Sequence, residues 1–174
     1  MLLKDKVAIV TGAGQGIGAA IAQAYAREGA KVAVVDMNAE AADAVAAGIR
    51  QSGGAAKGFA CNVAERESVD RMASAVAAEW GRIDILVNNA GITRTAMLHK
   101  MTQEQWQQVI DVHMNGSFYC LQAVVNGMIE RKSGRIINVT STAGLLGTIG
   151  QINYSAAKAA IAGMTKSAAK ALGR

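Results

Sequence analysis

Proline is absent from this chain of 174 residues, and aromatic residues make up only 4% of it. A sequence that is poor in aromatics but rich in alanine, glycine, valine and isoleucine favours close packing of helices on a sheet over an aromatic-rich sandwich. Its hydrophobic content of 51% is ample for a buried core. The length predicts a single domain over residues 1–174.

Cysteines are also scarce: Cys61 and Cys120 are the only two, and they match no metal-binding or redox spacing. We therefore predict no metal site and expect two small apolar side chains in a reducing compartment. No apolar run reaches the ~18 residues that suggest a membrane span. The N-terminal segment carries charges where a secretory signal needs an apolar run. These absences predict a soluble, cytoplasmic protein that does not enter a membrane.

Basic residues outnumber acidic ones by 18 to 13, which gives a net charge of +5. They are scattered along the chain, and the longest cluster, residues 130–135, contains no aromatic residue. A solvated helix end and turn is the favoured interpretation of this cluster. The alternative is a docking patch for an acidic or phosphorylated substrate carrier. Nucleic-acid binding is not predicted, because no concentrated basic stripe is present.

Short β-branched runs alternate with longer helical patterns along the chain. The strands are expected at residues 6–10, 31–36, 57–61, 83–87 and 135–140. The helices are expected at 17–28, 39–51, 68–80, 102–131 and 154–172. Strands that are apolar almost throughout predict a sheet covered on both faces, with parallel strands joined by crossover helices. The fold class is therefore a doubly wound α/β domain.

A glycine-rich turn follows the first expected strand, in the sequence Thr-Gly-Ala-Gly-Gln-Gly-Ile-Gly of residues 11–18. Glycines at a strand-to-helix turn let the backbone approach a pyrophosphate, which the helix N-terminus then binds through N–H groups. A tight turn without a ligand remains the alternative. The candidate binding residues of this turn are Gly12, Gln15, Gly16, Ile17 and Gly18.

Two further features support nucleotide binding. Asp36 ends the second strand, where a carboxylate can accept hydrogen bonds from the ribose diol of adenosine. It would repel a 2′-phosphate, and its neighbour Met37 brings no positive charge, so the sequence predicts NAD(H) in preference to NADP(H). Asn-Asn-Ala-Gly at 88–91 closes the fourth strand, at the edge where such sheets bind ligands.

Near the C-terminal end, Tyr154 and Lys158 lie four residues apart and thus on one face of a helix. A neighbouring ammonium group favours the phenolate form of a tyrosine, which suits the pair to proton transfer. Taken alone, such a pair is more often an amphipathic surface feature. Downstream of a nucleotide-binding motif, catalysis becomes the better interpretation.

Thr-Gly-x-x-x-Gly-x-Gly, Asn-Asn-Ala-Gly and Tyr-x-x-x-Lys, in this order and spacing, resemble the short-chain dehydrogenase/reductase superfamily of the classical type. The resemblance runs from residue 4 to residue 174 and implies a Rossmann-like sheet. The runs at 91–94 and 134–141 resemble 3-oxoacyl-carrier-protein and acetoacetyl-CoA reductases. This narrower likeness implies a small carbonyl or alcohol substrate, such as an acyl-carrier-protein or CoA thioester, and a homodimer or homotetramer.

The resemblance also implies roles for individual residues. Tyr154 would be the proton donor during carbonyl reduction, Lys158 would tune it and bond the nicotinamide ribose, and Ser141 at the end of the fifth strand would polarise the substrate oxygen. The segment 144–153 would form a wall of the substrate site. The remaining cofactor contacts would be Asn62, Val63, Asn89, Ala90 and Gly91.

The sequence departs from the family pattern at two positions. Where many members have an asparagine that anchors a relay water, this chain has His113, and Asn115 lies nearby. His113 either joins the proton relay, holds a water through its backbone, or packs in the helix core. Asn62 stands where aspartate is common, and its carbonyl oxygen can accept the same hydrogen bond from adenine.

Members of the family usually continue beyond the Tyr/Lys helix into another strand, a nicotinamide contact, a substrate lid and a last strand, whereas this sequence ends at Arg174. The expected fold therefore lacks those strands and leaves the fifth strand's edge uncovered. An NAD(H)-dependent reductase of a 3-oxoacyl thioester is the leading hypothesis. A dehydrogenase of a sugar, polyol or other small alcohol and a non-catalytic nucleotide-binding or oligomerisation module are the alternatives.

Overall fold

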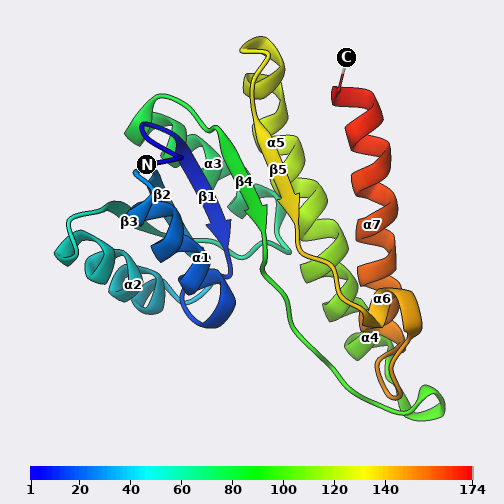
Figure 1. Cartoon of the computed structure of the whole chain (residues 1–174). Coiled ribbons are helices and arrows are strands. Elements are labelled where there is room, and N and C mark those ends of the chain that lie inside the picture. Colours follow the sequence, from blue (N-terminus) through cyan, green and yellow to red (C-terminus); the bar gives the residue numbers. More distant parts are fainter. Residues whose placement is uncertain (174) are drawn as a thin grey trace.

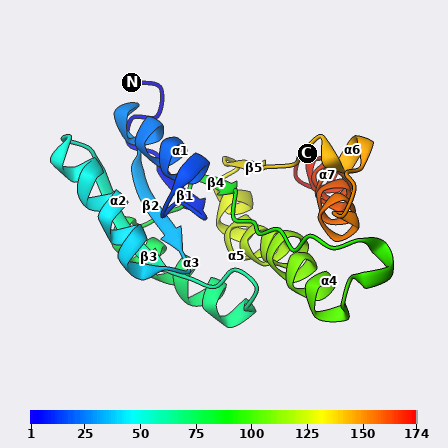
Figure 2. The ribbon, with the colours of Figure 1, turned by 90° about the horizontal axis from the view of Figure 1, so that it is seen from below.

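The computed structural model describes residues 1–173, and its core is one parallel sheet with helices on both faces (Figures 1 and 2). The strands are β1 (Val7–Thr11), β2 (Lys31–Asp36), β3 (Ala55–Ala60), β4 (Ile85–Asn88) and β5 (Arg135–Asn138). The α-helices are α1 (Gly16–Arg27), α2 (Ala39–Gln51), α3 (Arg66–Trp80), α4 (Gln103–Ile110), α5 (Gly116–Glu130), α6 (Ala143–Leu146) and α7 (Ile152–Leu172). A 3₁₀ turn, η1 (Leu98–Lys100), and a π-helical turn, η2 (Asp111–Asn115), complete the order.

The strand order is β3-β2-β1-β4-β5, and every neighbouring pair is parallel. The order reverses between β1, which begins the first half, and β4, which begins the second. A doubly wound sheet binds its ligands at such a switch point, at the carboxyl ends of the strands. The predicted Rossmann-like fold is therefore confirmed.

The alternation of side chains along each strand divides the core into two layers. Val7 and Ile9 of β1 face α3 and α5, in a cluster that includes Leu86 and both cysteines. Ala8 and Val10 face α1 and α2 on the opposite side, as Figure 2 shows for the helices. Burial raises the pKa of the Cys61 and Cys120 thiols, which fits the small apolar side chains expected.

β5 is an exception to the expected full burial of the strands. It forms one edge of the sheet in the described residues, and its side chains alternate between exposed and half-buried, with Ile137 42% exposed. α7 lies beyond this edge and not over the β1–β2 layers (Figure 2). Ile136 packs against the layer of α3 and α5, whereas Ile137 on the opposite face is exposed, so the coverage expected on both faces is incomplete at β5.

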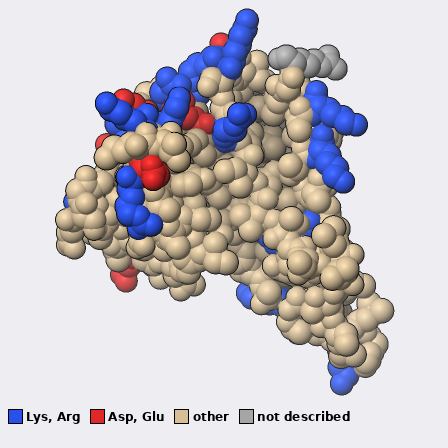
Figure 3. Space-filling model, viewed as in Figure 1, with Lys and Arg blue, Asp and Glu red and all other residues tan. Residues whose placement is uncertain are grey.

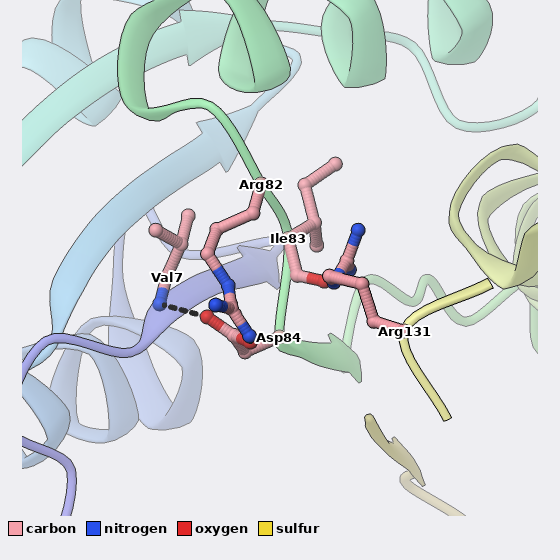
Figure 4. Close-up of polar contacts among 5 residues, drawn as sticks. All are labelled: Val7, Arg82, Ile83, Asp84 and Arg131. Atoms are coloured by element: carbon pink, nitrogen blue, oxygen red, sulfur yellow. Dashed lines mark hydrogen bonds and ion pairs between the residues drawn. The ribbon is translucent and has the colours of Figure 1, made fainter. Parts of the chain in front are cut away.

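At the amino end of the sheet, the buried Asp84 holds β1 and β4 together. Its carboxylate accepts a 3.0 Å hydrogen bond from the Val7 amide and a 2.9 Å hydrogen bond from the Arg82 guanidinium (Figure 4). Arg131, from the basic cluster at 130–135, donates to the Ile83 carbonyl oxygen at 2.6 Å. This arginine therefore ties the end of α5 to the sheet, where a solvated cluster was the favoured expectation.

The helix expected at 102–131 is present but not uniform. Its middle, η2, has π-helical bonding, and the Gly116 amide donates to the carbonyl oxygen of Asp111, five residues earlier. The short elements η1 and α6 were not predicted. β5 ends at Asn138, so Ser141 lies three residues beyond the strand and just before α6, not at the strand's end as expected. No helix of residues 1–173 is long and apolar enough to cross a membrane.

Candidate active site

The carboxyl ends of the strands point to the lower part of Figure 1, where the glycine turn lies beside the segment that follows β4. Gly12 has a φ of +62°, and a Cβ added there would lie 2.8 Å from the Ala90 Cα. A Cβ at Gly18 would lie 2.2 Å from the Gly12 carbonyl oxygen. Gly16, with a φ of +56°, faces open space. Two glycines thus allow close packing, and the third leaves room for a ligand.

The N-terminus of α1 suits an anionic ligand. Its N-cap residue, Gln15, makes no side-chain hydrogen bond to the first turn, and that turn contains no acidic residue. Ile17 is 71% exposed. Uncapped N–H groups and the positive end of the helix dipole together favour a phosphate. The pyrophosphate of a dinucleotide therefore fits the described residues.

Asp36 lies at the end of β2, directly beside this turn. Its Oδ2 accepts from the Gly14 amide at 2.9 Å, and its Oδ1 accepts from the Asn38 amide at 3.0 Å. A Cβ on Gly14 would lie 2.9 Å from the Asp36 Cγ, so only glycine permits this approach. The two bonds fix the carboxylate next to the phosphate-binding turn, where an adenosine ribose fits.

Asn89 has a structural task in this arrangement. Its side-chain amide donates to the carbonyl oxygens of Thr11 at 3.0 Å and Gly12 at 3.2 Å. The Thr11 hydroxyl in turn accepts from the backbone amides of Asn89 and Ala90, both at 3.1 Å. The end of β4 is thus bonded to the glycine turn. This leaves the half-buried Ala90 and the exposed Gly91 at the open edge of the site.

Asn62 and Val63 lie after β3, on the far side of the same edge. The Asn62 Oδ1 accepts from the Ala64 amide at 3.1 Å, and its Nδ2 donates to Glu65 at 2.8 Å. Val63 is 8% exposed and packs against Gly116, the first residue of α5. The Asn62 side chain thus shapes the turn into α3, and its predicted contact with adenine stays a prediction.

Tyr154 and Lys158 lie on the first turns of α7. The Lys158 Nζ is 5.7 Å from the centre of the Tyr154 ring and donates to the Val139 carbonyl oxygen at 2.6 Å. Lys158 is only 4% exposed, and burial lowers its pKa from the ordinary value. The ammonium group is therefore held beneath the tyrosine by the segment that leaves β5.

Ser141 is brought to the same place by α6. The Ser141 Oγ accepts from the Ala143 amide at 3.2 Å, while the neighbouring Thr140 hydroxyl donates to the Lys158 carbonyl oxygen at 2.8 Å. A Cβ on Gly144 would lie 2.7 Å from the Ala159 backbone nitrogen, so α6 rests directly on the α7 backbone. Ser141 is half-buried and Thr142 is exposed. Because the Thr140 hydroxyl is engaged with α7, Ser141 remains the best candidate for the substrate oxygen.

His113 points into the site from the π-helical turn, and Asn115 does not. The His113 and Tyr154 rings meet edge to face with their centres 5.2 Å apart, whereas Asn115 bonds to Asp111 on its own helix. The His113 Nε2 lies 2.7 Å from the Ile92 carbonyl oxygen and 3.0 Å from its nitrogen. The Ile92 N–H points at Nε2 as well, so the ring is anchored to the Ile92 backbone in either tautomer.

Burial keeps the His113 imidazole neutral. The side chain is 1% exposed, and desolvation lowers its pKa from 6.5 to about 4, helped by the positive charge of Lys158 and opposed by the bond to Ile92. Its Nδ1 is buried without a hydrogen-bond partner in the described residues. The ring therefore presents one unbonded nitrogen next to the Tyr154 and Lys158 pair.

The mouth of the site has an apolar rim, formed by the loop after β4 and the segment around α6. The Ala96 amide donates to the Gly150 carbonyl oxygen at 2.9 Å and joins the two parts. Figure 3 shows this lower right region with few charged atoms, in contrast to the upper surface, where both basic and acidic side chains gather. The rim residues are between 41% and 86% exposed: Met97, Leu98, Leu145, Leu146, Ile149 and Ile152.

Comparison with known proteins agrees with this geometry. The sequence profile of the family described as short chain dehydrogenase matches residues 6–174. The chain belongs to the short-chain dehydrogenase family. The members of this family are oxidoreductases that act on CH–OH groups and use nicotinamide cofactors.

Two relatives of this short-chain dehydrogenase are named as 3-oxoacyl-[acyl-carrier-protein] reductases. The one from Synechocystis sp. is 50% identical over 171 residues, which cover 98% of this chain and 69% of the relative. The one from Thermotoga maritima is 42% identical over 172 residues, which cover 99% of this chain and 70% of the relative. A D-threitol dehydrogenase from Mycolicibacterium smegmatis is 46% identical over 164 residues, which cover 94% of this chain and 63% of the relative. The chain thus spans about two thirds of the length of these relatives.

Proposed function

We propose that this short-chain dehydrogenase binds NAD(H) and interconverts the ketone of a 3-oxoacyl thioester with the corresponding secondary alcohol. The observation that supports the proposal is the packing of the Tyr154 and Lys158 pair against the segment that leaves β5 and carries Ser141, at the carboxyl ends of the strands. A bound nicotinamide would donate or accept the hydride. The residues of the chain then have to hold the substrate oxygen and move one proton.

Each of the three side chains has a separate task in this proposal. The Ser141 hydroxyl keeps its own proton free to donate to the substrate oxygen, since its Oγ accepts from the backbone. Tyr154 delivers a proton to that oxygen during reduction and removes it in the reverse direction. The Lys158 ammonium stabilises the phenolate electrostatically and stands ready to bond the nicotinamide ribose.

His113 is proposed to support this proton transfer as a neutral group. With Nε2 bonded to the Ile92 backbone and a pKa of about 4, the imidazole carries no charge near neutral pH. Its Nδ1, which has no partner in the described residues, can share a hydrogen bond with a relay water beside Lys158. This assigns His113 a place in the relay through hydrogen bonding without a change of charge.

The preference for NAD(H) rests on Asp36. A carboxylate fixed by two backbone amides bonds well to a ribose diol and repels a 2′-phosphate. Titration of NADH and NADPH against the native chain and Asp36→Ser tests this point. Native protein should bind NADH at least 10-fold more tightly, and the variant should lose most of that difference. Equal affinity of the native chain for both cofactors would refute the preference.

The apolar rim supports an acyl substrate, because a hydrocarbon chain gains free energy when it covers exposed leucine and isoleucine side chains. The exposed Lys132 and Arg135 suit an acidic or phosphorylated carrier, such as an acyl carrier protein or CoA. The exposed Phe118 and Ile129 of α5 support a homo-oligomer, which light scattering would detect. Two buried free thiols favour the reducing cytoplasm.

A dehydrogenase of a polyol is the second candidate, and the likeness to D-threitol dehydrogenase favours it. Two activity assays separate the candidates: reduction of acetoacetyl-CoA by NADH, and oxidation of threitol by NAD⁺. Each is measured for the native chain and for Tyr154→Phe. The thioester should be turned over with the higher kcat/KM, and the variant should lose turnover yet bind NADH within twofold of native. Turnover retained in Tyr154→Phe would refute both candidates. Binding of NADH without any turnover by the native chain would favour a non-catalytic module.

A further inference from the structure

Asn153 is a fully buried polar residue directly before Tyr154, in the first turn of α7. Its side-chain Nδ2 donates to the carbonyl oxygens of Arg94 and Gln105, each at 3.0 Å. Its Oδ1 accepts from the Tyr154 backbone amide at 2.8 Å. The sequence placed this residue only in a wall of the substrate site, but its bonds join α7 to two other segments.

The three bonds use both amide hydrogens and the amide oxygen of one short side chain. Arg94 belongs to the loop after β4, Gln105 to the first turn of α4, and Tyr154 to α7. Aspartate offers no donor when ionised, and serine offers only one hydrogen, so neither reproduces the pattern. A buried amide with all these partners fixes the relative positions of the segments it joins.

The segment after β4 is held at two points from the same side as Tyr154. His113 bonds to Ile92 through Nε2, and Asn153 bonds to Arg94 two residues later. Beyond them, the Ala96 amide bonds to the Gly150 carbonyl oxygen. The segment therefore keeps a fixed distance from the tyrosine across the open edge of the site.

We propose that Asn153 is a positioning residue that sets Tyr154 against the segment 91–96, and thus against the cofactor and substrate. We call the three hydrogen bonds of Asn153 the Asn153 clamp. The catalytic consequence of the clamp rests on the proposed function, whereas the clamp itself does not. Misplacing a proton donor by about 1 Å costs up to ~100-fold in rate. Binding of the adenosine half depends on Asp36 and the glycine turn, which Asn153 does not touch.

Asn153→Ala and Asn153→Asp test the clamp in the full chain. Amide hydrogen exchange at Ile92 and Ala96, which do not bond to Asn153, should become about 10-fold faster in both variants, as expected when two hydrogen bonds are lost. The kcat should fall at least 10-fold with the NADH dissociation constant within twofold of native. In Asn153→Asp, kcat should recover as the pH falls, because a protonated carboxyl can again donate one hydrogen bond.

Val124→Ala, in the core of α5, serves as the matched control for a loss of thermal stability. It should lower the melting temperature without changing kcat or the exchange at Ile92 and Ala96. Unchanged exchange and kcat in Asn153→Ala would overturn the proposal, and so would losses that Val124→Ala reproduces. If the native chain has no turnover, the proposed function fails, while the exchange at Ile92 and Ala96 still decides whether the clamp exists.

Discussion

Acid should destabilise this protein in the pH window set by the buried His113. In the unfolded chain the imidazole titrates near 6.5, whereas burial lowers its pKa in the fold to about 4. Between these two values the unfolded state binds the additional proton, so the free energy of unfolding falls as the pH falls. The contribution of His113 is fully present above pH 6.5 and fully lost below pH 4. The pKa difference corresponds to about 3 kcal/mol, a large part of the stability of an ordinary domain.

His113→Asn removes this titration, because an amide neither gains nor loses a proton in this range and can still bond to Ile92. Urea unfolding would be followed by tryptophan fluorescence at pH 7, 6, 5 and 4 for the native chain and the variant. The difference in unfolding free energy between the two proteins isolates His113, since the other acidic and basic groups titrate in both. The native chain should lose about 3 kcal/mol more than the variant between pH 7 and pH 4.

His99 provides the matched control, because it is the only other histidine and is exposed in η1. His99→Asn should keep the native dependence on pH. Parallel curves for the native chain and His113→Asn would refute the reasoning, since they would mean that His113 titrates alike in both states. Such a result would also remove the basis for treating it as a neutral group in the site.

Three further predictions concern stability and function together. Lys158→Met should reduce turnover at least ~100-fold. Its free energy of unfolding in urea should stay unchanged or rise by about 1 kcal/mol, because the substitution removes a buried ammonium whose pKa is lowered by desolvation. A large loss of stability would contradict this prediction. Asp84→Asn should cost about 2 kcal/mol, measured the same way, since hydrogen bonds to a buried carboxylate weaken, while NADH titration shows unchanged affinity at the opposite end of the sheet. Gly18→Ala should lower the free energy of unfolding by about 1–3 kcal/mol and weaken NADH binding, because its Cβ would lie 2.2 Å from a carbonyl oxygen. Gly163→Ala is the control: its Cβ would meet open space on α7, so it should be neutral or stabilising by up to about 1 kcal/mol.

The main architecture could be predicted because its signals are local and repeated. Each of the five expected strands overlaps an observed one, and the boundaries of β2 and α2 match at both ends. The glycine turn was located because positive φ values and close backbone contacts leave few alternatives to glycine. The exposure of Ile137 in β5 was not predicted, since it depends on which helices cover each face of the strand and not on the strand's own apolar residues.

The details of the site depended on contacts between distant segments, which single-sequence periodicity does not record. α6 is only four residues long and forms where Gly144 packs on the α7 backbone, so the sequence contains no helical periodicity from which to predict it. Asn153 looks like any polar residue before a tyrosine, and its partners lie 48 and 59 residues away. His113 was distinguished from Asn115 by its spacing from Ser141, and its neutral state becomes visible only from its burial.

The π-helical turn also fixes the phase of the helix that follows it. A residue added to or removed from an α-helix rotates everything downstream by about 100°. The bulge at Asp111–Asn115 lets His113 face Tyr154 while Cys120 and Val124 still face the sheet. Deleting one residue there would leave α5 intact as a helix but turn its apolar stripe toward solvent. The one additional residue in this turn therefore determines both where His113 points in the site and which face of α5 packs on the sheet.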